Sequence, residues 1–221
     1  KFGSTPPHKE LLGELIDTQE AELKQYGVDV RLNTAGTVEE CKKAGACGVF
    51  LAVGGNPIAP PIPGHEKAVL AEQILAGEVK LTGKTIAVIG GGVTGLETAE
   101  YLSADNKVTV VEMQNAVGTT LYPSVLHFLK ERLDKNGAEI LTGHAIKAIG
   151  EGEVTLSVTA TAMEVTRKAD VVVFALGVRP NRALVDEMEA AFDRVILLGD
   201  TEKPGNIVNA MHSANDKAFV F

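Results

Sequence analysis

Glycine dominates the stretch GGGVTG at residues 90–95, which follows an apolar run and precedes a helix-like pattern in KTIAVIGGGVTGLETAEYL. Three of these glycines fit the spacing G-x-G-x-x-G, which is typical of loops that bind a dinucleotide pyrophosphate. The first permits a tight turn, the second lets the backbone approach the phosphates, and the third lets the helix pack closely on the strand. The helix N-terminus then directs free N–H groups and a positive dipole end at the anion. We therefore predict a phosphate-binding loop formed by Gly90, Gly91, Gly92, Val93, Thr94 and Gly95.

Glu112 is the second residue whose position indicates nucleotide chemistry. It ends an apolar stretch about 20 residues beyond the glycines, where a carboxylate can accept hydrogen bonds from a ribose diol. The same carboxylate would repel a 2′-phosphate, and no arginine follows in MQNAVG, so NAD(H) is favoured over NADP(H). A purely structural turn is the alternative, and the motif by itself does not distinguish NAD from FAD.

The elements around these residues alternate between strands and helices. Strands are expected at residues 85–90, 107–112, 138–143 and 169–177, helices at 93–104 and 124–136, and short antiparallel strands over 146–166. Such alternation requires parallel pairing through right-handed crossovers. The sequence therefore predicts a doubly wound, Rossmann-like α/β domain over residues 81–181, with a small antiparallel insertion.

Both flanks of this domain carry similar patterns. The first flank predicts an amphipathic helix over residues 8–26, strands at 28–33 and 47–55, the second buried on both faces, and a proline-rich linker at 56–64. The second flank predicts a strand at residues 194–200 and a helix from about Asn206. The endings GVFLAVGGNP and VVVFALGVRPN resemble each other, which suggests two domains of one type. We assign residues 1–80 and 182–221 to the second domain.

Composition excludes several classes of protein. The 221 residues carry a net charge of −8 without a Lys/Arg cluster, which argues against nucleic acid as a partner. No apolar run is long enough to cross a bilayer and no signal-peptide pattern opens the chain, so we expect a cytoplasmic protein without membrane contact. Cys41 and Cys47 are expected to be inert packing residues, and the five scattered histidines predict no metal site.

The motifs occur in an order that resembles a known family. Five segments follow one another in the same order as in pyridine-nucleotide-dependent flavoprotein reductases. They are GVFLAVGGNPIAPPIPG, the glycine stretch, VTVVEMQ, ADVVVFALGVRPN and VILLGD. More closely, nearly the whole chain is similar to the C-terminal half of the group of 2-enoate reductase, 2,4-dienoyl-CoA reductase and trimethylamine dehydrogenase. The resemblance implies an NAD-binding domain inserted in an FAD-type domain, behind an N-terminal barrel that carries FMN and a 4Fe-4S cluster.

This resemblance extends to individual residues. The glycine loop and Glu112 match the NAD fingerprint, and Gly177 matches the strand end near the nicotinamide. Val53 and Gly54 match the turn that lines the FAD, and Asp200 matches the acid that holds the ribitol hydroxyls. The helix that begins near Ile207 would direct its N-terminus at the pyrimidine side of the flavin.

The sequence departs from that group in several respects. The family's FAD-type domain opens with its own G-x-G-x-x-G, and neither this motif nor the barrel and cluster cysteines occur here. We therefore expect a fragment with an incomplete FAD-type domain, inactive in isolation. In the intact protein hydride would pass from NADH to FAD, then through the cluster and FMN to an enoate-type C=C bond or related substrate.

No catalytic side chain is demanded by this chemistry, because the cofactors carry it and the protein supplies orientation. The small-molecule substrate would be reached through the N-terminal region, and the oligomeric state is left open. The alternative is a catalytically silent module that holds NAD or ADP for structure or regulation.

Overall fold

The computed structural model describes residues 2–220 and contains two compact units. Unit 1 comprises the residues up to Gly27 together with Ile58–Gly177, and unit 2 comprises Val28–Pro57 and the residues from Val178 onward. The predicted division near residues 80 and 181 is based on sequence patterns such as the proline-rich stretch, whereas these units are defined by packing. Residues 58–80 and the N-terminal segment therefore belong to the same unit as the glycine loop.

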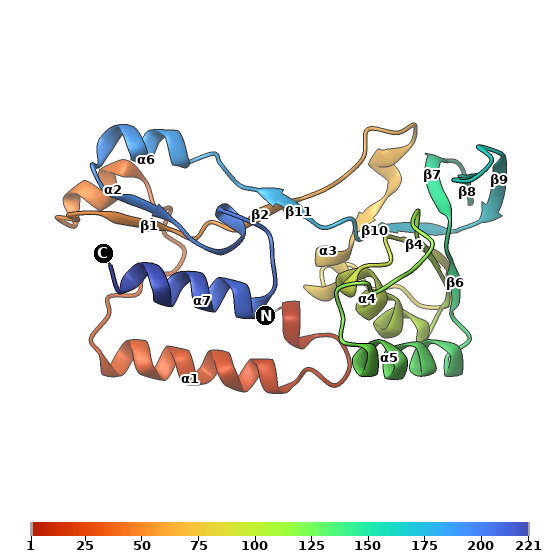
Figure 1. Ribbon diagram of the computed structural model, residues 1–221, viewed down its shortest axis with the longest axis horizontal. Helices are drawn as coiled ribbons and strands as arrows, with labels where there is room; N and C mark the ends of the chain where they lie inside the picture. The colour runs from red at the N-terminus through yellow and green to blue at the C-terminus, as the bar shows by residue number, and fades with distance from the viewer. Residues whose placement is uncertain (1, 221) are drawn as a thin grey trace. The chain divides into compact units, whose positions relative to one another are not determined.

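Unit 1 is built on a five-stranded parallel sheet (Figure 1). Its strands, in spatial order, are β3 (Val69–Leu70), β10 (Val171–Phe174), β4 (Thr85–Ile89), β5 (Lys107–Val111) and β6 (Glu139–Leu141). The associated helices are α3 (Ala71–Leu75), α4 (Val93–Ser103) and α5 (Pro123–Lys135). Parallel strands joined through helices confirm the predicted α/β class.

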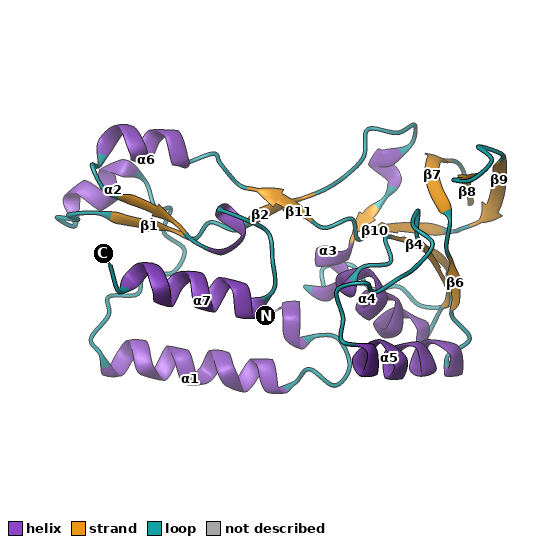
Figure 2. Ribbon diagram, in the orientation of Figure 1, coloured by secondary structure: helices purple, strands orange, loops and turns teal. Residues whose placement is uncertain are grey.

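Different elements cover the two faces of this sheet. Successive side chains of a strand point to opposite faces, so neighbouring residues of β4 pack into different cores. Ile86 and Val88 of β4 pack in one apolar core with α3, α4 and α5. Ala87 and Ile89 pack on the other face with apolar residues of a separate antiparallel sheet. That sheet contains β7 (His144–Ile149), β8 (Glu153–Val158) and β9 (Glu164–Lys168). Figure 2 draws the strands of both sheets in orange.

The order of the strands creates a topological switch point beside β4. From β4 the chain proceeds outward through α4, β5, α5 and β6, and it later returns as β10 on the opposite side of β4. The connections that leave β4 and β10 therefore diverge at the carboxyl edge of the sheet. In open α/β sheets this is where ligands bind.

The N-terminal segment is attached to unit 1 by polar contacts. It contains a short helical turn, η1 (Phe2–Ser4), and helix α1 (Leu11–Gln25). Lys9 forms an ion pair with Glu97 of α4, and the Thr5 hydroxyl donates to the Leu75 carbonyl oxygen at 2.7 Å. The amphipathic helix predicted over residues 8–26 is present, but its apolar side chains are not buried, and Leu11 is 73% exposed.

Unit 2 has a small core between two strands and two helices. Strand β1 (Val49–Leu51) pairs in parallel with β12 (Val195–Leu197), and α2 (Val38–Lys43) and α6 (Val185–Ala191) contribute to the same core. The unit also contains η3 (Gly199–Thr201) and α7 (Ile207–Ala218). None of the helices within residues 2–220 has both the length and the apolarity needed to span a membrane.

Short strands border two of the three points where the chain passes from one unit to the other. Strand β2 (Gly55–Pro57) pairs antiparallel with β11 (Val178–Pro180). Residues 56–64 were predicted to be a linker without ladder pairing. The pairing is possible because the prolines stand in a two-stranded ribbon, where a missing N–H can face away from the partner strand. A further turn, η2 (His65–Lys67), follows in unit 1.

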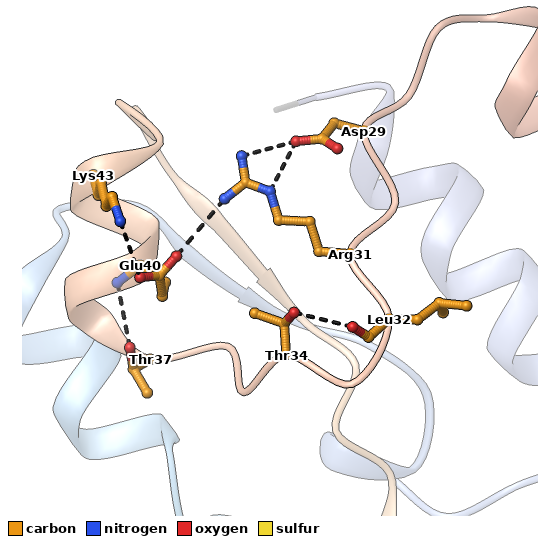
Figure 3. Close-up of polar contacts among 7 residues, drawn as sticks. All are labelled: Asp29, Arg31, Leu32, Thr34, Thr37, Glu40 and Lys43. Atoms are coloured by element: carbon orange, nitrogen blue, oxygen red, sulfur yellow. Dashed lines mark hydrogen bonds and ion pairs between the residues drawn. The ribbon is translucent and has the colours of Figure 1, made fainter.

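The predicted strand at residues 28–33 is wrong. Among the described residues 2–220 this segment pairs with no strand, and side-chain contacts hold it instead (Figure 3). Arg31 Nε donates to Asp29 Oδ2 at 2.8 Å, and Arg31 also lies 3.7 Å from a carboxylate oxygen of Glu40 on α2. Apolar alternation here has no buried face to match, since Leu32 is 79% exposed.

The predicted buried strand at residues 47–55 is also shorter than expected. It is divided into β1 and β2 because Gly54 has φ +72°, a left-handed conformation that ends an extended strand. Of the three β1 residues only Leu51 is buried, whereas Phe50 remains 37% exposed.

Candidate nucleotide-binding site

A cavity of about 540 Å³ lies at the carboxyl edge of the unit 1 sheet, at the switch point. Its wall is made mainly by residues that directly follow parallel strands. The lining residues used below are Gly90, Gly92, Val93, Thr94, Glu112, Met113, Gln114, His144, Ala175 and Gly177. Residues from widely separated parts of the sequence thus meet in one concave site.

The predicted glycines have distinct structural tasks. Gly90 has φ +116°, and a Cβ there would lie 2.4 Å from the Ala175 carbonyl oxygen. A Cβ at Gly95 would lie 1.9 Å from the Gly90 carbonyl oxygen, so this glycine permits the helix to approach the strand. At Gly92 a Cβ would meet nothing within 4 Å, and the residue lines the cavity. Gly92 therefore keeps open the space that a phosphate would need.

Helix α4 begins directly at this cavity. Gly92 is its N-cap residue, and Val93 and Thr94 of the first turn line the cavity. No acidic side chain occurs in that turn. The unpaired N–H groups and the positive dipole end of α4 therefore face the cavity, and no carboxylate in the first turn of the helix competes with an anion for them.

The Glu112 carboxylate is fixed by two backbone donors. Its Oε2 accepts from the Gly91 N–H at 2.6 Å, and its Oε1 accepts from the Gln114 N–H at 2.8 Å. Each carboxylate oxygen can accept a further hydrogen bond, and the residue lines the cavity. Gly91 allows this close approach, because a Cβ there would lie 2.9 Å from Glu112 Cβ. The carboxylate is thus held ready for hydroxyl donors.

Gly177 lies on the opposite side of the switch point, after β10. It has φ +81°, lines the cavity, and accepts a hydrogen bond from the Ile58 N–H at 3.0 Å through its carbonyl oxygen. Along the sheet edge the cavity wall therefore runs from the β10 end, past the glycine loop, to Glu112 and the start of β7, which follows β6 in the chain. The cavity volume of about 540 Å³ lies within the usual range for small-molecule and cofactor sites.

The residues predicted to contact FAD lie in unit 2. Gly54 accepts from the Asn181 N–H at 3.0 Å and from the Thr201 hydroxyl at 3.4 Å, so its turn adjoins η3. The neighbouring Val53 carbonyl oxygen accepts from Asn181 Nδ2 at 3.5 Å. These bonds fix the turn after β1.

Asp200 and Ile207 stand around the start of α7. Asp200 Oδ1 accepts from the Gly205 N–H at 3.0 Å, and the residue lines a cavity of about 230 Å³ with the first turn of α7. Ile207 opens α7 and is 51% exposed. A cavity of this size is below the usual range for a cofactor site, so these residues fit only one portion of an FAD.

Sequence reasoning missed the remaining cavity wall, above all Met113, Gln114 and His144. The sequence alone assigns no ligand to the histidines, yet His144 is half-buried and lines the cavity. A usable signal existed, because residues at the carboxyl ends of parallel strands converge on one edge.

Fold and site together define a dinucleotide-binding domain of the oxidoreductase type. Residues 16–202 match the family described as pyridine nucleotide-disulphide oxidoreductase, which is well over half of the chain. The chain belongs to this family, whose members bind FAD and use NAD(P)H.

Two curated relatives are oxidoreductases. A cinnamate reductase of Clostridium sporogenes is 34% identical over 221 residues, covering 98% of this chain and 33% of the relative. An NADH oxidase of Thermoanaerobacter brockii is 31% identical, covering 96% of this chain and 34% of the relative. The chain thus spans about a third of the length of these relatives.

Solved structures agree with this placement. A 2-naphthoyl-CoA reductase complex has a TM-score of 0.87 at 27% identity, covering 96% of this chain and 32% of that one. Histamine dehydrogenase from Rhizobium sp. 4-9 has a TM-score of 0.81 at 22% identity, covering 98% and 37%, and shows the shared fold. The predicted resemblance to the enoate-reductase group is confirmed.

Proposed function

We propose that this chain is the NADH-binding portion of a flavoprotein oxidoreductase in which hydride passes from NADH to FAD. One observation carries the proposal: the Glu112 carboxylate is held against the glycine loop at the switch point, beside the N-terminus of α4. This pairing of a phosphate-sized opening with a ribose-binding carboxylate is the chemistry an NADH site requires.

Each part of the cavity wall has a role in this proposal. Gly92 and the first turn of α4 bind the pyrophosphate, and Glu112 accepts hydrogen bonds from the adenosine ribose. Gly177 and Ala175 border the nicotinamide end. When bound, NADH supplies the hydride and FAD accepts it, so the protein needs to supply orientation and not a side-chain acid or base.

Unit 2 would contribute a portion of the FAD site. The turn at Val53 and Gly54 and the Asp200 carboxylate are the residues we propose for it, with the N-terminus of α7 at Ile207 near the flavin. The α7 dipole favours negative charge at its N-terminus. Further FAD contacts would come from outside this chain, which spans about a third of its relatives.

The final acceptor is a narrower proposal. The names cinnamate reductase and 2-naphthoyl-CoA reductase support an enoate-type C=C bond or a related small molecule. We propose that electrons reach it through a 4Fe-4S cluster and FMN in an N-terminal region, in a cytoplasmic protein that contacts neither membrane nor nucleic acid.

The test uses the full-length polypeptide, mixed with NADH in the absence of oxygen while flavin absorbance is recorded. We expect rapid bleaching in the wild type and slower bleaching at subsaturating NADH in Glu112→Ala. Glu131→Ala on α5, where the side chain is 62% exposed, is the matched control. A flavin that NADH does not reduce would contradict the proposed reaction.

A silent nucleotide-binding module is the second candidate. It is favoured by the small size of the unit 2 cavity, about 230 Å³, which cannot hold a whole FAD. We expect the isolated chain to be colourless and still to bind NADH. Stoichiometric FAD retained through gel filtration would contradict the view that half of the flavin site lies elsewhere, and absence of flavin from the full-length protein would favour the module.

A further inference from the structure

We propose that His144 recognises the 6-amino group of the adenine ring in the bound dinucleotide. This inference rests on the proposed binding of NADH in the unit 1 cavity, and it adds a base-specific contact to that site. It is carried by the place of His144 in the cavity wall and by the protonation that its neighbour imposes on the imidazole.

Strand order locates the base. In the sheet the strand ends lie in the order β10, β4, β5 and β6. The cavity is lined by residues at the ends of β10, β4 and β5 and by the start of β7, which follows β6 in the chain. If the pyrophosphate lies on the loop after β4 and the ribose on Glu112 after β5, the base lies beyond the ribose, over the end of β6. His144 begins β7 just after that end, and its backbone N–H donates to the Glu112 carbonyl oxygen at 3.0 Å. His144 is therefore adjacent to the residue that positions the ribose.

A carbonyl oxygen fixes the proton on the His144 ring. Nδ1 lies 2.6 Å from the Thr142 carbonyl oxygen, which can only accept a hydrogen bond. Nδ1 must therefore carry the hydrogen, and in the neutral ring Nε2 presents a lone pair. The hydrogen bonds among residues 2–220 include none to Nε2, so His144, a residue of the cavity wall, has one ring acceptor without a partner in the protein.

A ring acceptor at this place distinguishes two purines. Adenine carries an amino group at position 6, which donates a hydrogen bond, whereas hypoxanthine carries an oxygen there, which accepts. Adenine therefore satisfies Nε2, while hypoxanthine would place two acceptors opposite each other. A site that bonds one group rejects an analogue lacking it, because its own polar atom loses its partner.

The experiment compares binding of NADH with binding of its deaminated analogue, reduced nicotinamide hypoxanthine dinucleotide, by titration calorimetry on the folded chain. One net hydrogen bond corresponds to about tenfold in affinity, so we expect the wild type to prefer NADH by about that factor. The variants are His144→Leu and His144→Gln, each checked for folding by circular dichroism. His127→Leu, on the surface of α5 with a 67% exposed side chain, is the matched control.

The two variants should lose the preference in different ways. Leucine offers no acceptor, so the affinity for NADH should fall towards the affinity for the analogue. Glutamine can present either its oxygen or its amino group, so the affinity for the analogue should rise towards the affinity for NADH. His127→Leu should keep the wild-type ratio.

Three results would overturn the proposal. Equal wild-type affinity for both dinucleotides would exclude base recognition by an acceptor. A preference that persists in both folded His144 variants would assign recognition to another group. A wild-type chain that binds neither dinucleotide would overturn the proposed nucleotide site as well, which distinguishes that failure from the first two.

Discussion

The side-chain carboxylate of Glu112 accepts a hydrogen bond from the backbone N–H of Gly91 at 2.6 Å. This bond joins the end of β5 to the loop after β4, so the predicted ribose acceptor and the predicted phosphate loop form one structural unit. The second carboxylate oxygen is held by the Gln114 N–H at 2.8 Å. Both carboxylate oxygens of Glu112 are thus fixed by backbone donors.

Replacing Glu112 with alanine should weaken NADH binding by about 1–2 kcal/mol, because the hydrogen bonds to the ribose hydroxyls are lost. The affinity for NADPH relative to NADH should rise in the same variant, since the charge that repels a 2′-phosphate is removed. Titration calorimetry with both nucleotides measures the two effects. Unchanged NADH affinity would remove Glu112 from the site.

Alanine at Gly92 should affect NADH binding, whereas alanine at Gly95 should affect the stability of the fold. At Gly92 a Cβ meets no atom within 4 Å, so the fold should tolerate it while the methyl group enters the space for phosphate and weakens NADH binding. At Gly95 a Cβ would lie 1.9 Å from the Gly90 carbonyl oxygen, so the free energy of unfolding should fall by about 2 kcal/mol or more. Urea unfolding and NADH titration separate the two properties. A destabilised Gly92→Ala with normal binding would contradict this division of roles.

The ion pair between Glu100 and Arg132 joins α4 to α5. The Glu100 side chain is only 4% exposed, so Arg132→Met should leave a buried carboxylate without its partner and reduce the free energy of unfolding by about 2–4 kcal/mol. The double variant Glu100→Leu with Arg132→Met should recover much of that loss, because no charge then remains buried. Lys130→Met, at an exposed position of α5, is the control. Urea unfolding checks all three, and an unaffected Arg132→Met would refute the structural role of the pair.

The Asp170 carboxylate, which lies just before β10 at the other edge of the sheet, should make the free energy of unfolding depend on pH. The Thr85 backbone N–H donates to this carboxylate at 2.8 Å, and with help from Lys168 and Lys84 it holds the pKa of Asp170 below the ordinary value of 3.8. A lowered pKa in the folded state stabilises the protein above the unfolded-state pKa, and that contribution is lost as the pH falls through the folded-state pKa. The difference in unfolding free energy between wild type and Asp170→Asn should therefore shrink below about pH 4. A difference that stays constant down to strongly acidic pH would contradict the predicted linkage.

Much of unit 1 follows from local sequence. The spacing of apolar residues and the glycines predict β4, α4 and β5 closely, because each pattern acts within one element and the next. The helix predicted at residues 124–136 agrees equally well with α5, which begins at Pro123, a residue suited to the first turn of a helix.

The predictions that failed depend on contacts between residues that are far apart in the sequence. Residues 28–33 alternate like a strand, but a strand needs a neighbour, and no described segment pairs with them. The convergence of Met113, Gln114 and His144 on the glycine loop depends on the strand order, which short patterns do not contain. Of the predicted residues, Gly90, Gly92, Gly177 and Glu112 do line one cavity, and Gly91 and Gly95 are not among its lining residues. Contact of any of them with a nucleotide stays a prediction.

The most direct test of the account is to follow the backbone amide NMR signals of the chain during titration with NADH. The account predicts saturable shifts concentrated at Gly92, Val93, Thr94 and Glu112, with weaker binding of NADPH. Saturable shifts confined to residues outside the unit 1 cavity, or no shifts at all, would contradict it.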